Sequence, residues 1–451
     1  MKRAAQKGIS RMTMTVPNGL LIDPGTTNWI PKERYTSREF FDLEMEKLWP
    51  RVWQVACREE EIPNPGDFIE YTIGDQSILL VRSDSGTIKA YFNTCPHRGT
   101  RLAADCGNFG NDEIRCRYHA WRWDLGGSIR EVVDRHDFPA TMTDDDVRLR
   151  DVQVGRWGGF VFVNMDPNCE SLEEFLGDLP SLLRPYHFEQ MRFRAYRTTI
   201  FEANWKLVID SFNEGYHPQG THPQMLTWYD DTASVYRQVG KHARMGHDEQ
   251  RERKIGPSPR LQMSDDDYDE VELLLFQIEA TSGLWSREDR ARINDIQQNG
   301  LPDGVHAIDV LDDIRINGLK SRGIDLSGMT KAEILEGGDY HFFPNMVGPG
   351  AVGNFTLYRA RPNGLDPDST VMDMWALEWV APGSDPPAYH KKFYANWREK
   401  DWGLINNQDY ANYLEVQTGL KSRGCTGMML NPVQEANLLH MHRVIDQYLT
   451  S

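Results

Sequence analysis

CPHRGTRL (residues 95–102) and CRYHAWRWDLGG (116–127) hold two Cys/His pairs, Cys95 with His97 and Cys116 with His119. Each pair offers one thiolate and one imidazole, at a spacing that the tip of a single hairpin can present. Zinc sites usually place Cys with Cys and His with His in their short spacers, so the mixed pairs fit zinc poorly. A zinc site and four unrelated buried residues are the alternatives.

The mixed order suits a cluster that contains two different irons. In a Rieske [2Fe–2S] centre one iron takes two Cys and the other takes two His, so each loop supplies one ligand to each iron. The spacing therefore predicts that Cys95, His97, Cys116 and His119 hold such a cluster, and that the chain carries electrons.

The length and charge of the chain limit its class. A chain of 451 residues exceeds one comfortable core, so two domains are expected. A net charge of -17 argues against nucleic acid or an anionic membrane as partner. The basic N-terminal residues 1–19 lack the apolar core of a signal peptide, and no apolar run approaches membrane-spanning length.

The cysteines indicate the compartment. Their scattered spacing does not resemble a secreted disulfide framework. Together with an iron–sulfur site, free thiols predict a reducing, cytoplasmic location. The six cysteines are Cys57, Cys95, Cys106, Cys116, Cys169 and Cys425.

The pattern of the chain predicts an α+β protein. Residues 36–60 have helical spacing, with Thr36 or Ser37 as the N-cap. From about 66 to 165 short apolar runs alternate with Gly, Asp and Asn turns, which is typical of a small antiparallel β domain that presents both Cys/His loops. The predicted domains are 50–172 for the cluster, and 1–49 with 173–451 for the remainder.

The second part of the chain mixes helices and strands. Helices are predicted at 171–186, 204–217, 269–281, 390–420 and 433–450, and strands at 354–362 and 370–382. The rest of 230–340 is predicted to be polar and irregular, either a lid over a pocket or a solvated insertion. Gly348-Pro-Gly350-Ala-Val-Gly353 matches a dinucleotide fingerprint but lacks its strand–turn–helix context, so we interpret it as a turn.

A second set of metal-ligand residues follows Asn204. Asp210, Glu214 and His217 are expected on one helical face, with Pro218 and Gly220 ending the helix so that His222 returns to the same point. Two imidazoles and one carboxylate form the facial triad of non-heme iron oxygenases, which leaves positions open for O2.

The carboxylate of this triad must come from elsewhere in the chain. Asp409 is the best candidate, because it starts a predicted helix whose apolar positions suggest burial, and a buried carboxylate needs a partner such as a metal. Asp401 and Glu415 remain competitors. His440 and His442 alternate along a helix and therefore point apart, which favours surface or packing roles over a further metal site.

These motifs resemble the α (large, terminal oxygenase) subunit of the Rieske non-heme iron oxygenases, the aromatic-ring-hydroxylating dioxygenase group. The similarity rests on 95–102, 116–127, NWKLVIDSFNEGYHPQGTH (204–222) and the run at 408–420, in the family's order. It implies a small antiparallel-β Rieske domain and a larger α+β catalytic domain of the helix-grip type, in which helices cover an antiparallel sheet.

The resemblance also implies roles for single residues. His217, His222 and Asp409 would hold a mononuclear Fe(II), and Glu214 would bridge a cluster histidine of one subunit to an iron-ligand histidine of its neighbour. Asp210 would lie near the iron, and Asn204, at the start of that helix, is a further candidate catalytic residue. The bridging acid of ring dioxygenases is usually Asp and the second cluster loop usually reads YHGW, whereas this chain has Glu214 and Ala120.

The implied activity is a terminal oxygenase that hydroxylates an aromatic or other apolar small molecule, as in aromatic hydrocarbon catabolism. It would use O2 and electrons from a separate NAD(P)H-linked reductase or ferredoxin, within an α3 or α3β3 assembly. Oxidative demethylation by a monooxygenase is the alternative within this class. A ferredoxin-type electron carrier and a zinc-stabilised binding module are the alternatives outside it.

Overall fold

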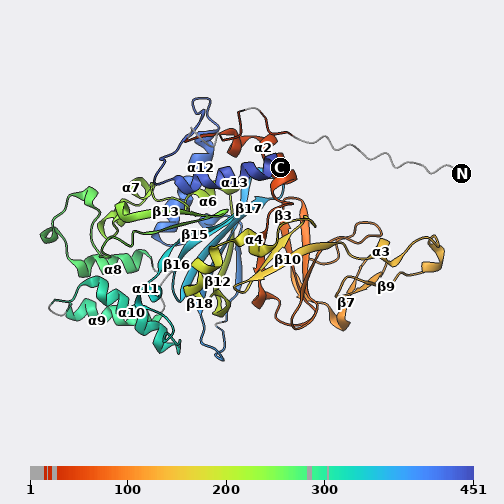
Figure 1. Cartoon of the computed structure of the whole chain (residues 1–451), viewed down its shortest axis with the longest axis horizontal. Helices are drawn as coiled ribbons and strands as arrows, with labels where there is room; N and C mark the ends of the chain where they lie inside the picture. Colours follow the sequence, from red (N-terminus) through yellow and green to blue (C-terminus); the bar gives the residue numbers. More distant parts are fainter. Residues whose placement is uncertain (1–14, 18, 23–27, 282–286, 302–303, 387) are drawn as a thin grey trace.

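The computed structural model describes all residues except 1–14, 18, 23–27, 282–286, 302–303 and 387. The basic N-terminal segment 1–19, for which no signal peptide is expected, therefore lies almost entirely outside the described residues. The molecule is elongated, with the β sheets of the smaller domain at one end and a large sheet covered by helices at the other (Figure 1). Among the described residues, no helix combines the length and apolarity needed to cross a membrane.

The small domain is built on two antiparallel sheets, as predicted for 66–165. Across the larger sheet the strands are β2 (Gln54–Arg58), β11 (Phe160–Asn164), β10 (Asp151–Trp157), β5 (Ile88–Phe92), β4 (Gln76–Arg82), β3 (Asp67–Ile73) and β6 (Cys106–Asn108). The smaller sheet contains β7 (Glu113–Arg115), β8 (Arg122–Asp124) and β9 (Ile129–Glu131), followed by α3 (Asp144–Val147). These strands fall within the predicted 50–172 domain, whose boundaries stay a prediction.

One eight-stranded sheet forms the centre of the larger domain. Its strands, in order across the sheet, are β13 (Ser234–Val239), β14 (His242–His247), β15 (Gly337–Phe342), β16 (Met346–Ala351), β17 (Asn354–Asn363), β18 (Asp366–Trp379), β12 (Met191–Phe201) and β19 (Lys391–Tyr394). All neighbours are antiparallel except β12 and β19. The predicted α+β class is confirmed.

Helices cover one face of this sheet. In Figure 1, α6, α12 and α13 lie together above the central strands, close to α2 from the start of the chain. Ser37 caps α2 through its side chain, as one of the two predicted caps. The covering elements are α1 (Glu33–Thr36), α2 (Arg38–Leu43), α6 (Trp205–Asp210), α7 (Pro218–Thr221), α12 (Leu404–Leu420) and α13 (Ala436–Thr450); β1 (Trp29–Pro31) and β20 (Gly427–Met429) form a separate two-stranded sheet.

Several predicted helices are shorter than expected, and the segment 230–340, predicted to be largely irregular, contains helices and strands. The helix at 171–186 is broken into α4 (Leu172–Leu176) and α5 (Leu179–Leu182) at Gly177, whose φ of 52° ends the first helix. Residues 391–394 form β19 instead of helix. The segment 230–340 is far from irregular: besides β13 and β14 it contains α8 (Glu270–Ala280), α9 (Arg287–Asn299), α10 (Ala307–Ser321) and α11 (Lys331–Ile334). An apolar cluster of its own, which includes Leu274 of α8 and Leu311 of α10, packs α8, α9 and α10 together.

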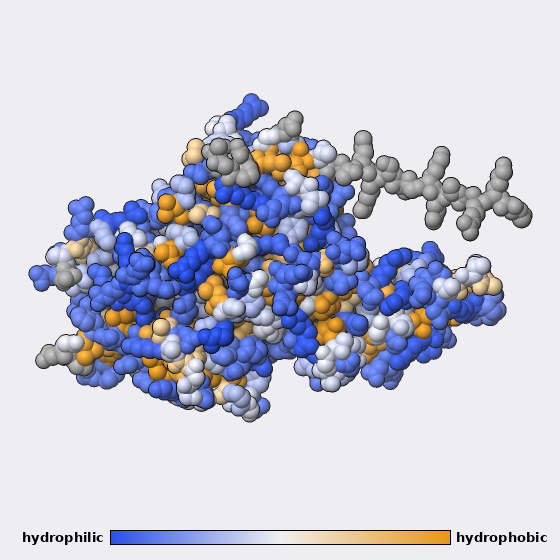
Figure 2. Space-filling model, in the orientation of Figure 1, coloured by the Kyte–Doolittle hydropathy of each residue, from blue (hydrophilic) through white to orange (hydrophobic). Residues whose placement is uncertain are grey.

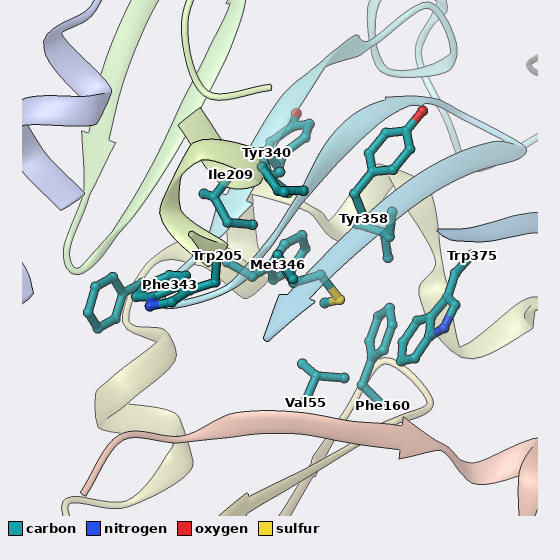
Figure 3. Packing of buried hydrophobic residues seen from close by; sticks show 14 of the residues in the cluster. Val55, Phe160, Trp205, Ile209, Tyr340, Phe343, Met346, Tyr358 and Trp375 are labelled. Carbon is teal, nitrogen blue, oxygen red and sulfur yellow. The ribbon is translucent and has the colours of Figure 1, made fainter. Parts of the chain in front are cut away.

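A continuous core joins the two domains. Figure 3 shows Val55 and Phe160 of the small domain facing Trp375 of the large sheet, and the rings of Phe160 and Trp375 stack at 6.3 Å. Arg359 of β17 donates to the carbonyls of Val55 and Ala56, so polar contacts reinforce this interface. The visible surface is mostly hydrophilic (Figure 2), in line with the charge of the chain.

Candidate functional site

The two cluster loops are closed by their own backbone. Cys95 and His97 follow β5, and the amide of Cys95 donates to Thr100 O at 2.9 Å. Cys116 and His119 lie between β7 and β8, and the amide of Cys116 donates to Trp121 O at 2.9 Å. Each loop is therefore closed as a tight turn, the first after β5 of the larger sheet and the second between β7 and β8 of the smaller sheet.

The four side chains separate by type. The Nδ1 atoms of His97 and His119 lie 3.1 Å apart, and the thiols of Cys95 and Cys116 are close enough to hydrogen-bond. Both thiols are buried, and both imidazoles are half-buried. Two thiolates at one point and two imidazoles at another is the donor set that a Rieske cluster requires, so the residues fit the group. Burial raises the pKa of Cys95 to about 11, which a bound cation would reverse.

Ala120, which stands where this motif usually has Gly, adopts a strained conformation. Its φ is 59°, in the left-handed region that L-residues with a Cβ disfavour. The small side chain of Ala does not remove this backbone cost, because the cost comes from the Cβ itself.

The second group of ligand residues lies beyond the end of α6. The helix stops at Asp210 instead of continuing to His217, so Glu214 occupies the following turn. Pro218 starts the short helix α7, with His217 as its N-cap and His222 as its C-cap. The expected helix-breaking Pro218 is thus a helix-starting residue, and α7 is the element that separates the two histidines.

The structure brings His217, His222 and Asp409 together. Asp409 Oδ1 lies 2.8 Å from His222 Nε2 and 3.4 Å from His217 Nε2. Candidate ligand atoms of these residues lie within 4.8 Å of one another. Two imidazole nitrogens and one carboxylate converging on a point fit a mononuclear Fe(II), because this set leaves coordination positions open.

Each histidine is oriented by a second hydrogen bond. His217 Nδ1 lies 2.5 Å from Glu214 Oε1, and His222 Nδ1 lies 2.8 Å from Gln408 Oε1. Because Glu214 and Gln408 offer acceptors, each Nδ1 donates its proton and leaves Nε2 free toward the metal position. Glu214 is buried and also accepts from the backbone amide of His217 at 3.1 Å.

The electrostatics of the three residues match this arrangement. Burial opposes the charging of His217, but hydrogen bonds with Asp409 and Glu214 outweigh it and raise its pKa to about 10. Burial would raise the pKa of Asp409, but bonds from His217 and His222 lower it instead. The excess of negative charge around the two imidazoles is what a divalent cation would neutralise.

Asp401 and Glu415 do not join the group. Both are exposed, and Asp401 Oδ1 accepts from Gly403 N and Asn407 Nδ2 just before α12. Asp409 lies inside α12, which begins at Leu404, so it does not start the helix as predicted. Asp409 is buried and lies beside His217 and His222, as expected for the carboxylate of the triad.

Asp210 and Asn204 form hydrogen bonds with elements around the site. Asp210 Oδ2 accepts from Tyr35 Oη at 2.7 Å, and Tyr35 Oη lies 2.6 Å from His442 Nε2. Burial raises the pKa of Asp210 to about 7, against the Tyr35 hydrogen bond. Asn204 caps α6 by accepting from Lys206 N. In the described structure neither residue belongs to the group of His217, His222 and Asp409.

One position was missed by sequence reasoning, and one motif was a decoy. Gln408 stands next to Asp409, and its place one residue before a ligand is the signal that would have identified it. The packing role expected for His442 agrees with the structure, in which this residue is fully buried and receives a hydrogen bond from Arg34 Nε at 3.0 Å. Residues 348–353 continue β16 into a hairpin with β17, which excludes a strand–turn–helix dinucleotide loop.

Comparisons with known proteins agree with both centres. The pattern of the Rieske [2Fe-2S] domain matches residues 52–141, and that of the ring-hydroxylating alpha subunit (catalytic domain) matches residues 188–451. The glycine betaine monooxygenase oxygenase subunit of Chromohalobacter salexigens is 34% identical over 45% of this chain and 46% of that protein. The large oxygenase component of salicylate 5-hydroxylase from Ralstonia sp is 31% identical over 47% and 52%. The matched part thus spans about half the length of these relatives.

A solved structure extends the likeness of fold over the chain. The quaternary ammonium Rieske monooxygenase CntA, in complex with an inhibitor, superposes with a TM-score of 0.66 at 18% identity, covering 96% of this chain and 99% of that one. The catalytic-domain pattern matches well over half of the 451 residues. The chain therefore belongs to the ring-hydroxylating alpha-subunit family of Rieske oxygenases, whose members hold a [2Fe–2S] cluster and a mononuclear iron.

Proposed function

We propose that this chain is the terminal oxygenase component of a Rieske oxygenase. The observation that carries the proposal is the convergence of His217 Nε2, His222 Nε2 and Asp409 Oδ1, in a chain that also presents two Cys/His loops. A pure electron carrier has no use for the second group, and a zinc-stabilised module has no use for the open coordination positions.

Iron bound by the three residues would supply O2 activation. In a monooxygenation one oxygen atom enters a C–H bond of the substrate and the other leaves as water, with two electrons and two protons consumed. The chain's own contribution is to orient both imidazoles through Glu214 and Gln408, and to bury the carboxylate of Asp409. The [2Fe–2S] cluster that the Cys/His loops would hold would store the electrons.

The substrate and partners follow as part of this proposal. The relatives are named for salicylate, glycine betaine and quaternary ammonium compounds. An aromatic substrate, with a role in aromatic hydrocarbon catabolism, is therefore one of two substrate classes for this chain, and a quaternary ammonium compound is the other. Monooxygenation, including oxidative demethylation, is favoured by the monooxygenase names. A ferredoxin or reductase donor, an α3 or α3β3 assembly and a cytoplasmic location complete the proposal; the six unpaired thiols support a reducing compartment.

The proposal is tested by His217→Ala in the iron-loaded protein. We expect the variant to keep the Rieske EPR signal and to lose both the mononuclear iron and product formation in single turnover, because its cluster ligands are untouched. Iron content, EPR and product analysis measure this. A colourless protein that holds zinc at the Cys/His loops, or full turnover by His217→Ala, would overturn the proposal.

A further inference from the structure

One carboxylate beside the metal position is not used by it. Asp339 lies on β15 directly opposite Met245 of β14, so both side chains project from the same face of the sheet. Met245 Sδ lies 3.2 Å from the position that a Cβ on Gly215 would take. His341, two residues after Asp339 and on the same face, contacts Asn213 Nδ2 at 3.4 Å. The turn that runs from Asn213 to His217 therefore covers this face of the sheet.

Asp339 is half-buried and lacks a countercharge. In the described part of the structure its carboxylate has no ion pair or hydrogen bond to a side chain. Burial raises its pKa to about 7, and His217 is the one side chain among the described residues that lowers it. Asp409 and Glu214, by contrast, are fully engaged with the histidines. A partly buried carboxylate without a partner is costly, and a cationic ligand would relieve that cost.

Aromatic rings lie within the electrostatic reach of the same carboxylate. Tyr358 of β17 stacks on Phe212 with ring centroids 4.0 Å apart and an interplanar angle of 8°. Burial is the main cause that raises the pKa of Tyr229 and Tyr358, and the charge of Asp339 adds to it in both. The carboxylate supplies the charge that a cationic amine requires, and nearby aromatic rings supply apolar surface for its alkyl groups.

We propose that Asp339 binds the positively charged group of the substrate, and that the enzyme oxidises a small molecule that carries a cationic amine. This inference rests on the proposed oxygenase function, since it places the substrate beside the iron-binding group. An anionic substrate would meet the carboxylates of Asp339, Glu214 and Asp409 on its approach and is disfavoured. Within the expected class of aromatic or apolar substrates, the proposal selects molecules that carry a positive charge.

The test measures the binding of matched cations and uncharged isosteres to the iron-loaded protein. The pairs are choline with 3,3-dimethylbutan-1-ol, and benzyltrimethylammonium with neopentylbenzene, each differing by N⁺ in place of carbon. Calorimetry should show the cation of at least one pair binding about tenfold or more tightly than its isostere, as expected for a charged contact. Asp339→Asn should abolish that preference, and Asp339→Glu should retain part of it.

Two controls keep the outcome specific. Asp325→Asn removes one negative charge from an exposed loop position and should leave the preference unchanged. The cluster EPR signal and iron content of Asp339→Asn should equal those of the parent, which excludes misfolding. Equal binding of cation and isostere in both pairs, or an unchanged preference in Asp339→Asn, would overturn the inference.

The same measurements separate this inference from the proposed function. Product analysis is made beside the binding measurements. If the parent and Asp339→Asn both bind iron and oxidise uncharged aromatic compounds at equal rates, the oxygenase function stands and the role of Asp339 falls. If the group of His217, His222 and Asp409 holds no iron and no compound is oxidised, the function itself falls.

Discussion

At the scale of single residues, hydrogen bonds to the far side of each imidazole decide what the site can bind. Glu214 and Gln408 each accept from an Nδ1, which leaves both Nε2 atoms directed at Asp409. Without those acceptors either histidine could present the other nitrogen or rotate away. The metal position is therefore built as much by these two side chains as by the ligands themselves.

Ala120 offers a residue-scale prediction about stability. Ala120→Gly should stabilise the cluster loop by about 0.5–1 kcal/mol, because Gly adopts the observed φ of 59° without a Cβ clash. The measurement is the midpoint of thermal loss of the cluster's visible absorption, with Ala103→Gly as a matched control. A midpoint for Ala120→Gly equal to or below that of the parent would contradict the strain.

At the scale of elements, the early end of α6 shapes the site more than the helix itself. α6 stops at Asp210, and the turn that follows places Glu214 against His217 across the start of α7. Had the helix continued, Glu214 and His217 would have been neighbours along one helical face. The contact predicted from helical spacing does form, but the element that makes it is a turn.

Asn204 supports a prediction at this scale. Asn204 Oδ1 caps α6, and its Nδ2 donates to Pro367 O at 2.9 Å. Asn204→Ala should lower the free energy of unfolding by about 1–2 kcal/mol, because the cap and a buried hydrogen bond are lost. Thermal unfolding of the iron-loaded protein measures the loss, and kcat per mononuclear iron should stay near the parent value. A large fall in kcat per iron at unchanged stability would instead assign Asn204 a catalytic role.

At the scale of the whole molecule, the two metal-binding groups lie on distant parts of one chain. β7, which leads into the second cluster loop, and β9 of the same small sheet are at one end of the molecule, and α7 is near the other (Figure 1). Electron transfer over such a separation within a chain would be slow. This arrangement supports the proposed assembly, in which the cluster of one subunit approaches Glu214 of its neighbour.

Glu214→Gln tests that path. The amide keeps the shape of the side chain and one oxygen for His217 Nδ1, although its NH2 cannot accept from His217 N as Glu214 does. Both metals should remain bound, because none of their ligands is changed. The substitution removes the negative charge, and we expect reoxidation of the reduced cluster in single turnover to slow by about tenfold or more, in the range found for changes around metal ligands. Stopped-flow absorption of the cluster measures the rate, and Glu435→Gln, a neighbouring acid, is the control. Unchanged reoxidation with full iron content would exclude the bridge.

Much of the site was available in the sequence because short motifs carry local geometry. The Cys/His loops are closed by hydrogen bonds within a few residues, and His217 and His222 are joined by α7 alone. The α+β class, the strands β17 and β18, and the helices α8, α12 and α13 followed from apolar periodicity in the same way. What failed at this level was the interruption of helices and the content of 230–340, where polar residues conceal helices with a local core.

The sequence by itself determined which residue types meet and in which chemistry, since ligand spacing is a property of a few consecutive residues. The tertiary structure alone excluded Asp401 and Glu415, the competitors of Asp409, added Gln408, and placed Asp339 on the sheet face that the turn before His217 covers. Those choices depend on how α12 and β15 pack against the turn after α6, and such packing joins residues that lie far apart in the chain. Periodicity reports which face of an element is buried, but it does not report what that face meets.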